Sequence, residues 1–309
     1  MQVKDFKEGD HLKVRLLVSS LTRGVTNSGA PYLSLVLQDC SKSIDAKLWD
    51  VKSEIEKLLC VGKVFEFSLE VNMYRGALQA KVLGVLPVDE RSVNLNDFAF
   101  SSPISKDRLR DEIATALNSI KNENIAKIVT STLNLYGKDV YEYPAASKIH
   151  HNFVGGLATH ICGMISLAKS LCNIYPILDI DYMVAGVILH DLGKIEEFSS
   201  SIVTEYSTKG KLLGHISILD ARLLQVGKSL NLEDSEELLI LRHMVLAHHG
   251  ELEYGSPVRP ATIEAEMLTY IDNIDAKINI LSKAFEEVKP HEFTQKIFSM
   301  ENRSFYKLK

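Results

Sequence analysis

Hydrophobic and polar residues alternate with a period of two in the first part of the chain. The alternation is clear in five segments, at residues 12–18, 32–38, 44–49, 65–71 and 78–82. Successive side chains of a β-strand point to opposite faces, so each segment predicts a strand with one buried face. A short helical pattern over residues 51–59 lies between the third and fourth segments. The first part of the chain is therefore predicted to hold five strands and one inserted helix.

This order of elements is that of an OB-fold, a small Greek-key barrel that often binds oligonucleotides. We assign residues 1–88 to it. The strand face opposite the alternating leucines carries Tyr32, Lys47 and Trp49. Bases stack on aromatic rings and phosphates pair with cations, so we predict that these three side chains bind single-stranded nucleic acid. The alternative is that the two rings only pack against a loop or a second domain.

Apolar residues recur at intervals of three and four from residue 105 onward, which predicts helices. We expect helices over residues 105–120, 123–136, 155–175, 180–192, 212–230, 233–249 and 262–288, and a loop or hairpin over 199–211. Ser105 and Asn122 are expected N-caps. Residues 89–104 are polar and lack a clear period, so we assign them to a linker. The predicted fold is multidomain α and β, an OB-fold β-barrel followed by an all-α domain over residues 105–309.

Composition is ordinary for a globular protein, with 46% apolar and 24% charged residues in a chain of 309. No apolar run reaches about 18 residues, so we expect no membrane span. The mixed-charge N-terminus lacks a signal core, and the four cysteines form no Cys-x-x-Cys pair. We therefore expect a cytoplasmic protein with reduced cysteines.

Charge is unevenly distributed along the chain. The net charge of −5 gives no bulk argument for a nucleic-acid partner, but residues 1–88 carry 12 basic and 10 acidic residues, against 23 and 30 in the remainder. This asymmetry fits a binding domain joined to a metal-binding domain, although so small a difference also fits chance. Histidine is far more clustered, because eight of the ten histidines lie between His150 and His249.

The pair His190-Asp191 ends an apolar helical run. Burying a histidine and a carboxylate without partners is unfavourable, and a metal ion would satisfy both. Further candidate ligands lie on other apolar segments: His160, His215, His248, His249 and Asp272. Imidazole and carboxylate together suit Mn, Fe, Co, Ni or Zn. Asp191 has two oxygens with which to bridge a pair of ions, an arrangement common in phosphoester hydrolysis.

The order of these residues resembles the HD-domain superfamily of metal-dependent phosphohydrolases. The resemblance rests on residues 149–157 with His160, on His190-Asp191-Leu192-Gly193-Lys194, on His248-His249-Gly250-Glu251, and on Tyr270-Ile271-Asp272-Asn273. With an OB-fold in front, nearly the whole chain resembles the YhaM-type 3′→5′ exoribonucleases.

The resemblance implies two divalent metal ions, with Mn the first choice and Co, Fe, Ni or Zn left open. One ion would be held by His160, His190, Asp191 and Asp272, and the other by Asp191, His215, His248 and His249. The implied activity is hydrolysis of single-stranded RNA from its 3′ end to nucleoside 5′-monophosphates by two-metal hydroxide attack, with single-stranded DNA left open.

Further residues are assigned to substrate. Asp191 and Lys194 are predicted to be catalytic, since the Lys194 ammonium would balance charge on the scissile phosphate. His151 and Arg259 are predicted to contact RNA, and His150 is given the same role. We also expect a homo-oligomer, without a stoichiometry.

Two alternatives remain open from the sequence. An HD-type phosphodiesterase would act on a cyclic dinucleotide or another small nucleotide, but the loop Tyr254-Gly255-Ser256-Pro257 lacks the Gly-Tyr-Pro signature of one such group. A non-catalytic RNA-binding adaptor is opposed by the completeness of the ligand set.

Overall fold

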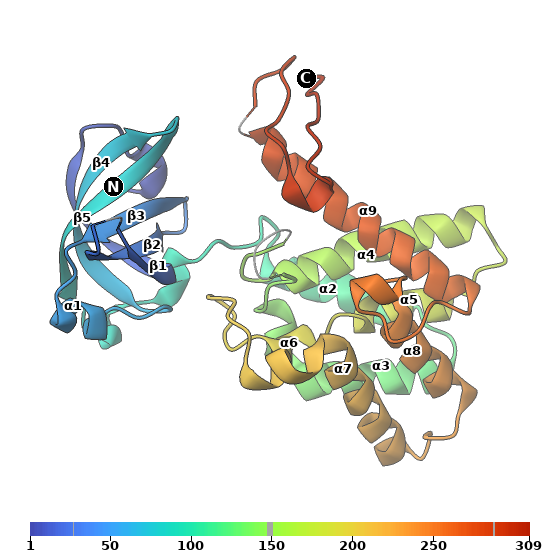
Figure 1. Ribbon diagram of the computed structural model, residues 1–309. Helices are drawn as coiled ribbons and strands as arrows, with labels where there is room; N and C mark the ends of the chain where they lie inside the picture. The colour runs from blue at the N-terminus through green and yellow to red at the C-terminus, as the bar shows by residue number, and fades with distance from the viewer. Residues whose placement is uncertain (27, 147–150, 287) are drawn as a thin grey trace. The chain divides into compact units, whose positions relative to one another are not determined.

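The computed structural model describes residues 1–26, 28–146, 151–286 and 288–309, which fold into two compact units (Figure 1). The units are Met1–Ser101 and Ser102–Lys309. Residues 89–104 span the division and contain two short 3-10 helices, Glu90–Ser92 and Leu95–Phe98. The second of these packs on the first unit, where Gln38 Nε2 donates a hydrogen bond to the Phe98 carbonyl over 3.0 Å.

The first unit is a closed five-stranded barrel with strand order β1-β2-β3-β5-β4, so the predicted OB-type fold is confirmed. Its strands are β1 His11–Val25, β2 Pro31–Gln38, β3 Ser43–Trp49, β4 Val64–Tyr74 and β5 Ala77–Pro87, with α1 Ser53–Leu58 between β3 and β4. Only the β3–β5 pair is parallel among these strands. A register shift between Val18 and Ser20 allows the long β1 to pair with both β2 and β4, because a bulge bends a strand.

Alternation along the strands fills the barrel. Leu33, Leu35 and Leu37 on β2 are at most 1% exposed, and Phe67 and Leu69 on β4 are fully buried. These inward side chains form one apolar cluster. The intervening residues point outward, as the period of two requires.

The second unit is helical. Its helices are α2 Lys106–Asn118, α3 Glu123–Tyr136, α4 Gly156–Ile174, α5 Ile180–Leu189, α6 Lys194–Glu197, α7 Thr208–Leu230, α8 Glu236–Ala247 and α9 Ile263–Glu286. The seven predicted helices are present, and Ser105 and Asn122 cap α2 and α3 through their side chains. Short 3-10 helices, Gly137–Tyr141 and Leu252–Tyr254, follow α3 and α8.

Several helix boundaries differ from the prediction by one to four residues, and two of the differences have a clear physical cause. The helix expected over 180–192 ends at Leu189, because the chain turns there and packs Gly193 against α7, where a Cβ would lie 2.2 Å from the His215 carbonyl oxygen. Residues 208–211, predicted as loop or hairpin, are helical, because the Ser207 hydroxyl caps α7 by accepting from the Gly210 N–H over 2.9 Å. α6 was not predicted.

Helix α4 lies in the core of this unit. By length and composition it is long and apolar enough to cross a membrane. It buries residues such as Leu157, Ile161 and Met164 in the helical core, which accounts for its apolar character. Residues beyond α9 return as a hairpin-like segment with bridges Phe293–Tyr306 and Ile297–Arg303.

Candidate metal centre

Seven polar side chains converge in the interior of the helical unit. They are His160 on α4, His190 and Asp191 in the turn after α5, His215 on α7, His248 and His249 after α8, and Asp272 on α9. Neighbouring imidazole rings have centroids between 4.3 and 5.6 Å apart. His160, His190 and His248 are fully buried, and Asp191 is 2% exposed. The fold therefore brings together all seven residues that the sequence singled out as ligands.

Asp191 lies at the centre of this cluster, with its two oxygens facing different rings. Its Oδ2 is 3.4 Å from His190 Nε2 and 3.9 Å from His160 Nε2. Its Oδ1 is 3.4 Å from His215 Nε2 and 3.7 Å from His248 Nε2. This geometry is what a carboxylate needs in order to bridge two cations.

Backbone carbonyls fix the orientation of three rings. The Nδ1 atoms of His190, His248 and His249 lie 2.7–2.9 Å from the carbonyl oxygens of Val187, Val245 and Tyr254. A carbonyl only accepts, so each Nδ1 is protonated and the Nε2 lone pair faces the cluster.

Carboxylates orient two further rings. His160 Nδ1 is 2.7 Å from Asp275 Oδ2, and His215 Nδ1 is 3.2 Å from Glu197 Oε1. Glu197 also accepts the backbone N–H of His215 over 3.0 Å. Such partners fix the tautomer of an imidazole and raise its basicity as a metal ligand.

The donor atoms fit divalent metal ions. Among the residues that the structure describes, the Nε2 atoms of His190, His215 and His248 and the Oδ1 of Asp191 are buried without a hydrogen-bond partner. An unpaired buried polar atom costs about 1–3 kcal/mol. Metal ions would satisfy all four, and imidazole with carboxylate is the donor set that first-row divalent metals prefer.

The carboxylates of Asp272 and Asp275 lie against His160 and make its surroundings negative. Burial lowers the pKa of His160, but hydrogen bonds to Asp272 and Asp275 outweigh burial and raise it to about 9. Burial raises the pKa of Asp272 and of Asp275, yet their bonds to His160 and His151 bring both below the usual range. This side of the cluster therefore favours a cation.

The His248 and His249 rings favour the neutral state. Burial, followed by the charge of His249, lowers the pKa of His248 well below its ordinary value. Burial, followed by the charge of His215, lowers the pKa of His249. Neutral imidazole is the form that ligates metals, so these rings need lose no proton at neutral pH.

Lys194, the first residue of α6, lies inside the cluster. Its Nζ donates to Asp191 Oδ2 over 2.6 Å, and its side chain is 12% exposed. Burial lowers the pKa of Lys194, but the charge of Asp191 and the hydrogen bond to it raise the pKa by more than burial lowers it. The side chain therefore remains an ammonium ion. For Asp191, the charges of Lys194 and His190 overcome burial and hold its pKa well below the usual range.

His151 lies against the cluster at 6% exposure. Its Nε2 is 2.8 Å from Asp275 Oδ2, and its backbone N–H donates to Asn279 Oδ1 over 3.0 Å. Its φ of 47° is unusual for a residue other than glycine, and such conformations concentrate at functional sites. His150, which was given the same predicted role, lies outside the described residues.

Two acidic residues were missed as site residues by the sequence reasoning. Asp275 follows Asp272 by three positions, which places both on one side of α9. That spacing was the available signal. Gly163 on α4 faces Asp275 closely, because a Cβ at this glycine would lie 2.5 Å from Asp275 Oδ1. Glu197 gave no comparable signal, since its partner His215 is 18 positions further along the chain.

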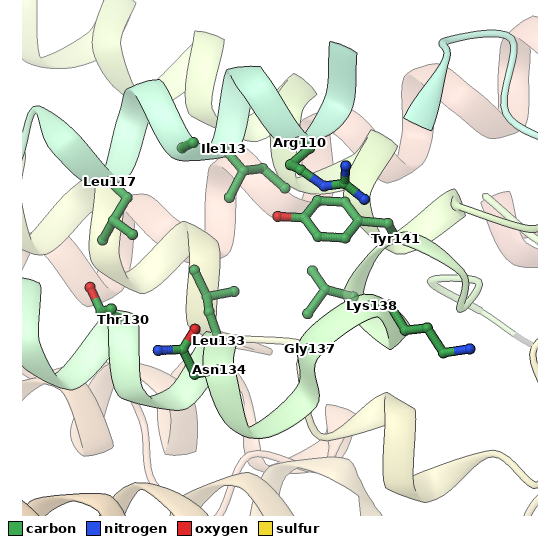
Figure 2. Close-up of a pocket in the computed structure, with 11 residues that line it drawn as sticks. Arg110, Ile113, Leu117, Thr130, Leu133, Asn134, Gly137, Lys138 and Tyr141 are labelled. Atoms are coloured by element: carbon green, nitrogen blue, oxygen red, sulfur yellow. The ribbon is translucent and has the colours of Figure 1, made fainter. Parts of the chain in front are cut away.

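Arg259 is placed outside the cluster. It lies in the loop between α8 and α9, where its guanidinium pairs with Glu251 over 2.8 Å and its side chain is 64% exposed. A separate pocket of about 340 Å³ lies between α2, α3 and the segment Gly137–Tyr141 (Figure 2). Its lining includes Arg110 and Tyr141 but no residue of the histidine cluster.

The three predicted barrel residues lie together on one outer face. Tyr32 and Trp49 are cross-strand partners with ring centroids 5.1 Å apart, and Lys47 Nζ lies 5.0 Å from the Tyr32 centroid. Trp49 is 43% exposed. Gly24 leaves room for the Tyr32 ring, because a Cβ there would lie 2.3 Å from it. The face therefore offers two aromatic rings, inclined at 37° to one another, beside a cation.

Known proteins match this chain over almost all of its length. The HD domain family matches residues 157–277. Proteins named 3′-5′ exoribonuclease YhaM are similar: that of Bacillus licheniformis is 45% identical over 97% of this chain and 95% of its own length. The protein from Bacillus subtilis has the same identity and coverage. The protein from Bacillus pumilus is 44% identical over 99% of this chain and 97% of its own length.

Among solved structures, the second OB-fold domain of replication protein A from Methanococcus maripaludis matches 30% of this chain and 98% of its own. The identity is 19% and the TM-score is 0.25.

Proposed function

The chain belongs to the YhaM family of 3′-5′ exoribonucleases, and we propose that it is a metal-dependent enzyme that hydrolyses single-stranded RNA from the 3′ end to nucleoside 5′-monophosphates. The observation that carries this proposal is the arrangement around Asp191, whose two oxygens face two sets of imidazole nitrogens. Two divalent cations on one carboxylate are typical of phosphoester hydrolysis.

Two metal ions are assigned to this cluster. His160, His190, Asp191 and Asp272 would hold one, and Asp191, His215, His248 and His249 the other. Mn²⁺ is our choice for both, on the mixed nitrogen and oxygen donor set, with Co, Fe, Ni and Zn as competitors. When bound, the ions supply Lewis acidity, which makes water a better nucleophile and stabilises charge on the phosphate.

The protein's own groups then have distinct tasks. Carbonyl and carboxylate partners hold the rings with Nε2 towards the centre. Lys194 keeps its proton, since burial alone does not overcome the charge of Asp191. We assign its ammonium to the phosphate, where a fixed positive charge opposes the negative charge that develops on the non-bridging oxygens.

The barrel face is assigned to the RNA strand. Tyr32 and Trp49 would stack bases and Lys47 would pair with a phosphate, which is the usual chemistry of single-strand binding. His151 and Arg259 are proposed to contact substrate on the helical unit. The proposed domains are the barrel over residues 1–88, a linker over 89–104 and the helical domain over 105–309. We further propose a cytoplasmic location and a homo-oligomer.

The proposal is tested with purified protein, Mn²⁺ and a 5′-labelled single-stranded RNA. A ladder that shortens from the 3′ end is expected, and nucleoside 5′-monophosphates should appear as products. Single-stranded DNA, a cyclic dinucleotide and a 3′-phosphorylated RNA are run in parallel. Hydrolysis of the cyclic dinucleotide without any shortening of RNA would overturn the proposal and support the phosphodiesterase alternative.

A further inference from the structure

Helix α9 carries a continuous apolar stripe on a side that does not face the metal centre. Its members, in order, are Ile263, Met267, Tyr270, Ile274, Ile278, Leu281 and Phe285. The spacings are 4, 3, 4, 4, 3 and 4 residues. Each set of three spacings covers eleven residues and three helical turns, which is 3.67 residues per turn. This value is close to the 3.6 residues per turn of an α-helix, so the stripe runs almost straight along the helix.

Much of this stripe is open to solvent. Ile263, Tyr270, Ile274 and Ile278 are 43%, 54%, 49% and 61% exposed. The C-terminal half of α9 extends beyond the other helices of its unit (Figure 1). Contiguous apolar surface of this kind marks an interaction site more often than scattered single residues do.

The stripe is symmetric about Ile274. Counted from Ile274, its members lie at −11, −7, −4, 0, +4, +7 and +11. Turning a second α9 antiparallel about this residue places Ile274 against Ile274 and Tyr270 against Ile278. The remaining pairs are Met267 with Leu281 and Ile263 with Phe285. A two-fold interface must be complementary to itself, and this spacing meets that condition. Met267 also packs against the core of its own unit, so the exposed residues Tyr270, Ile274 and Ile278 would carry the centre of the contact.

We propose that a second copy of this chain docks on the stripe, so that two α9 helices pair antiparallel about a two-fold axis at Ile274. No charged side chain lies among the seven positions, so the pairing brings no like charges into the seam. Asp272 precedes Ile274 by two residues and lies on the other side of the helix. Each α9 would therefore bind its own metal centre on one side and the second copy on the other.

The first test measures the mass of the full-length protein by light scattering and sedimentation equilibrium. A dimer is expected, and Ile274→Lys should reduce it to a single chain, because two lysines then meet at the axis. Leu239→Lys is the matched control, since Leu239 is 63% exposed on α8 and should leave the dimer intact. Unchanged circular dichroism and metal content show that the Ile274→Lys variant is folded.

The second test examines the register by disulfide formation, with the exposed Cys40 replaced by serine. Helix axes about 8–10 Å apart bring facing Cα atoms within disulfide range. Ile274→Cys should cross-link to itself. Tyr270→Cys should cross-link only when mixed with Ile278→Cys, since two antiparallel copies of position 270 lie about 12 Å apart along the axis.

Three results would overturn this inference. They are a single chain at all concentrations, a dimer that survives Ile274→Lys, and efficient self-cross-linking of Tyr270→Cys, which indicates parallel helices. A single chain would include the case in which the stripe is covered by the chain's own barrel. None of these readouts involves RNA hydrolysis, so failure here leaves the proposed enzymatic function standing.

Discussion

The buried polar side chains described in the barrel are paired within the chain, whereas several of those described in the helical unit are not. In the barrel, Gln38 and Asp39 are buried, and both bond to protein groups: Gln38 to the Phe98 carbonyl, and Asp39 to the backbone N–H groups of Val3 and Ser41. In the helical unit, the described buried groups include three imidazole nitrogens and one carboxylate oxygen that lack partners. Gln38 and Asp39 of the barrel are hydrogen-bonded within the chain. The three imidazole nitrogens and the carboxylate oxygen of the helical unit require a ligand such as a metal ion.

In the barrel, the residues assigned to function are separate from those that stabilise the fold. In the helical unit, the residues assigned to function lie among those that stabilise the fold. The barrel residues assigned to RNA lie on the outer face, away from the apolar cluster that holds the strands together. The residues assigned to metal lie among the buried side chains that hold the helices together. We therefore expect substitutions at the barrel face to alter binding alone, and substitutions at the cluster to alter folding, metal content and activity together.

The largest effect is expected from Asp191→Asn, which keeps the shape of the side chain but removes its charge. Hydrolysis should fall by at least about 10³-fold, comparable with the loss of a major electrostatic group. Metal content, measured by mass spectrometry of the elements, should fall with it, while binding of RNA to the barrel persists. Asp234→Asn is the control. Full activity in the Asp191 variant would refute the bridging role.

Removal of metal should act on one unit only. Binding at about 100 times Kd stabilises the native state by about 2.7 kcal/mol, so a chelator should lower the unfolding temperature of the helical unit. The barrel transition should stay where it is. Scanning calorimetry with and without the chelator distinguishes the two transitions. A shift in both units, or in neither, would contradict the assignment of the metal ions to the helical unit.

Asp275→Asn should have an intermediate effect. Asp275 holds the rings of His160 and His151, and loss of such a partner lowers metal affinity or activity by about 10–100-fold. Metal titration of the variant should show weaker binding, and excess Mn²⁺ should restore most of the activity. A defect that excess metal leaves unchanged would indicate a role beyond orienting His160.

A smaller effect is expected from Trp49→Ala on the barrel. Stacking of one base contributes about 1–3 kcal/mol and 1.4 kcal/mol is tenfold, so the KM for RNA should rise by about 5-fold or more. kcat on a short substrate and the unfolding temperature should not change. The comparison is with Leu86→Ala, a similarly exposed apolar residue on β5. Equal effects of the two variants would remove Trp49 from the RNA face.

The smallest effect concerns an ion pair at the edge of the helical unit. A hydrogen bond from Arg222, opposed by burial and aided by Lys209, lowers the pKa of Glu196 from its ordinary 4.5 to about 2. The stabilisation is therefore present above about pH 4.5 and is lost as pH falls towards 2. Urea unfolding of the protein and of Glu196→Gln should differ modestly at pH 7 and converge in acid. A difference independent of pH would contradict the ion pair.

Local patterns predicted the helices and strands well. The period of two and the recurrence at three and four residues each involve only residues close together in the sequence. The barrel strands and the core-facing leucines of β2 follow directly from that alternation. The ligand types were also visible, since His190 and Asp191 interrupt an apolar run. What the pattern could not give was contact between distant segments.

The orienting groups illustrate this limit. Val187 and Val245 act through their carbonyl oxygens, which every residue has, so no side chain marks them. Glu197 acts on His215 only because the chain turns back after α6. The end of α5 at Leu189 depends on the fit of Gly193 against α7, and that fit belongs to tertiary packing.

The histidine rings are oriented in two ways, which differ in whether an amino-acid substitution can remove the hydrogen-bond partner. His190 and His248 bond to main-chain carbonyls, which no substitution can delete. His160 and His215 bond to Asp275 and Glu197, which a single substitution can change. Each proposed ion has one ring of this second kind. A single substitution at Asp275 or Glu197 can therefore change electron donation to one proposed ion while every ligand stays in place.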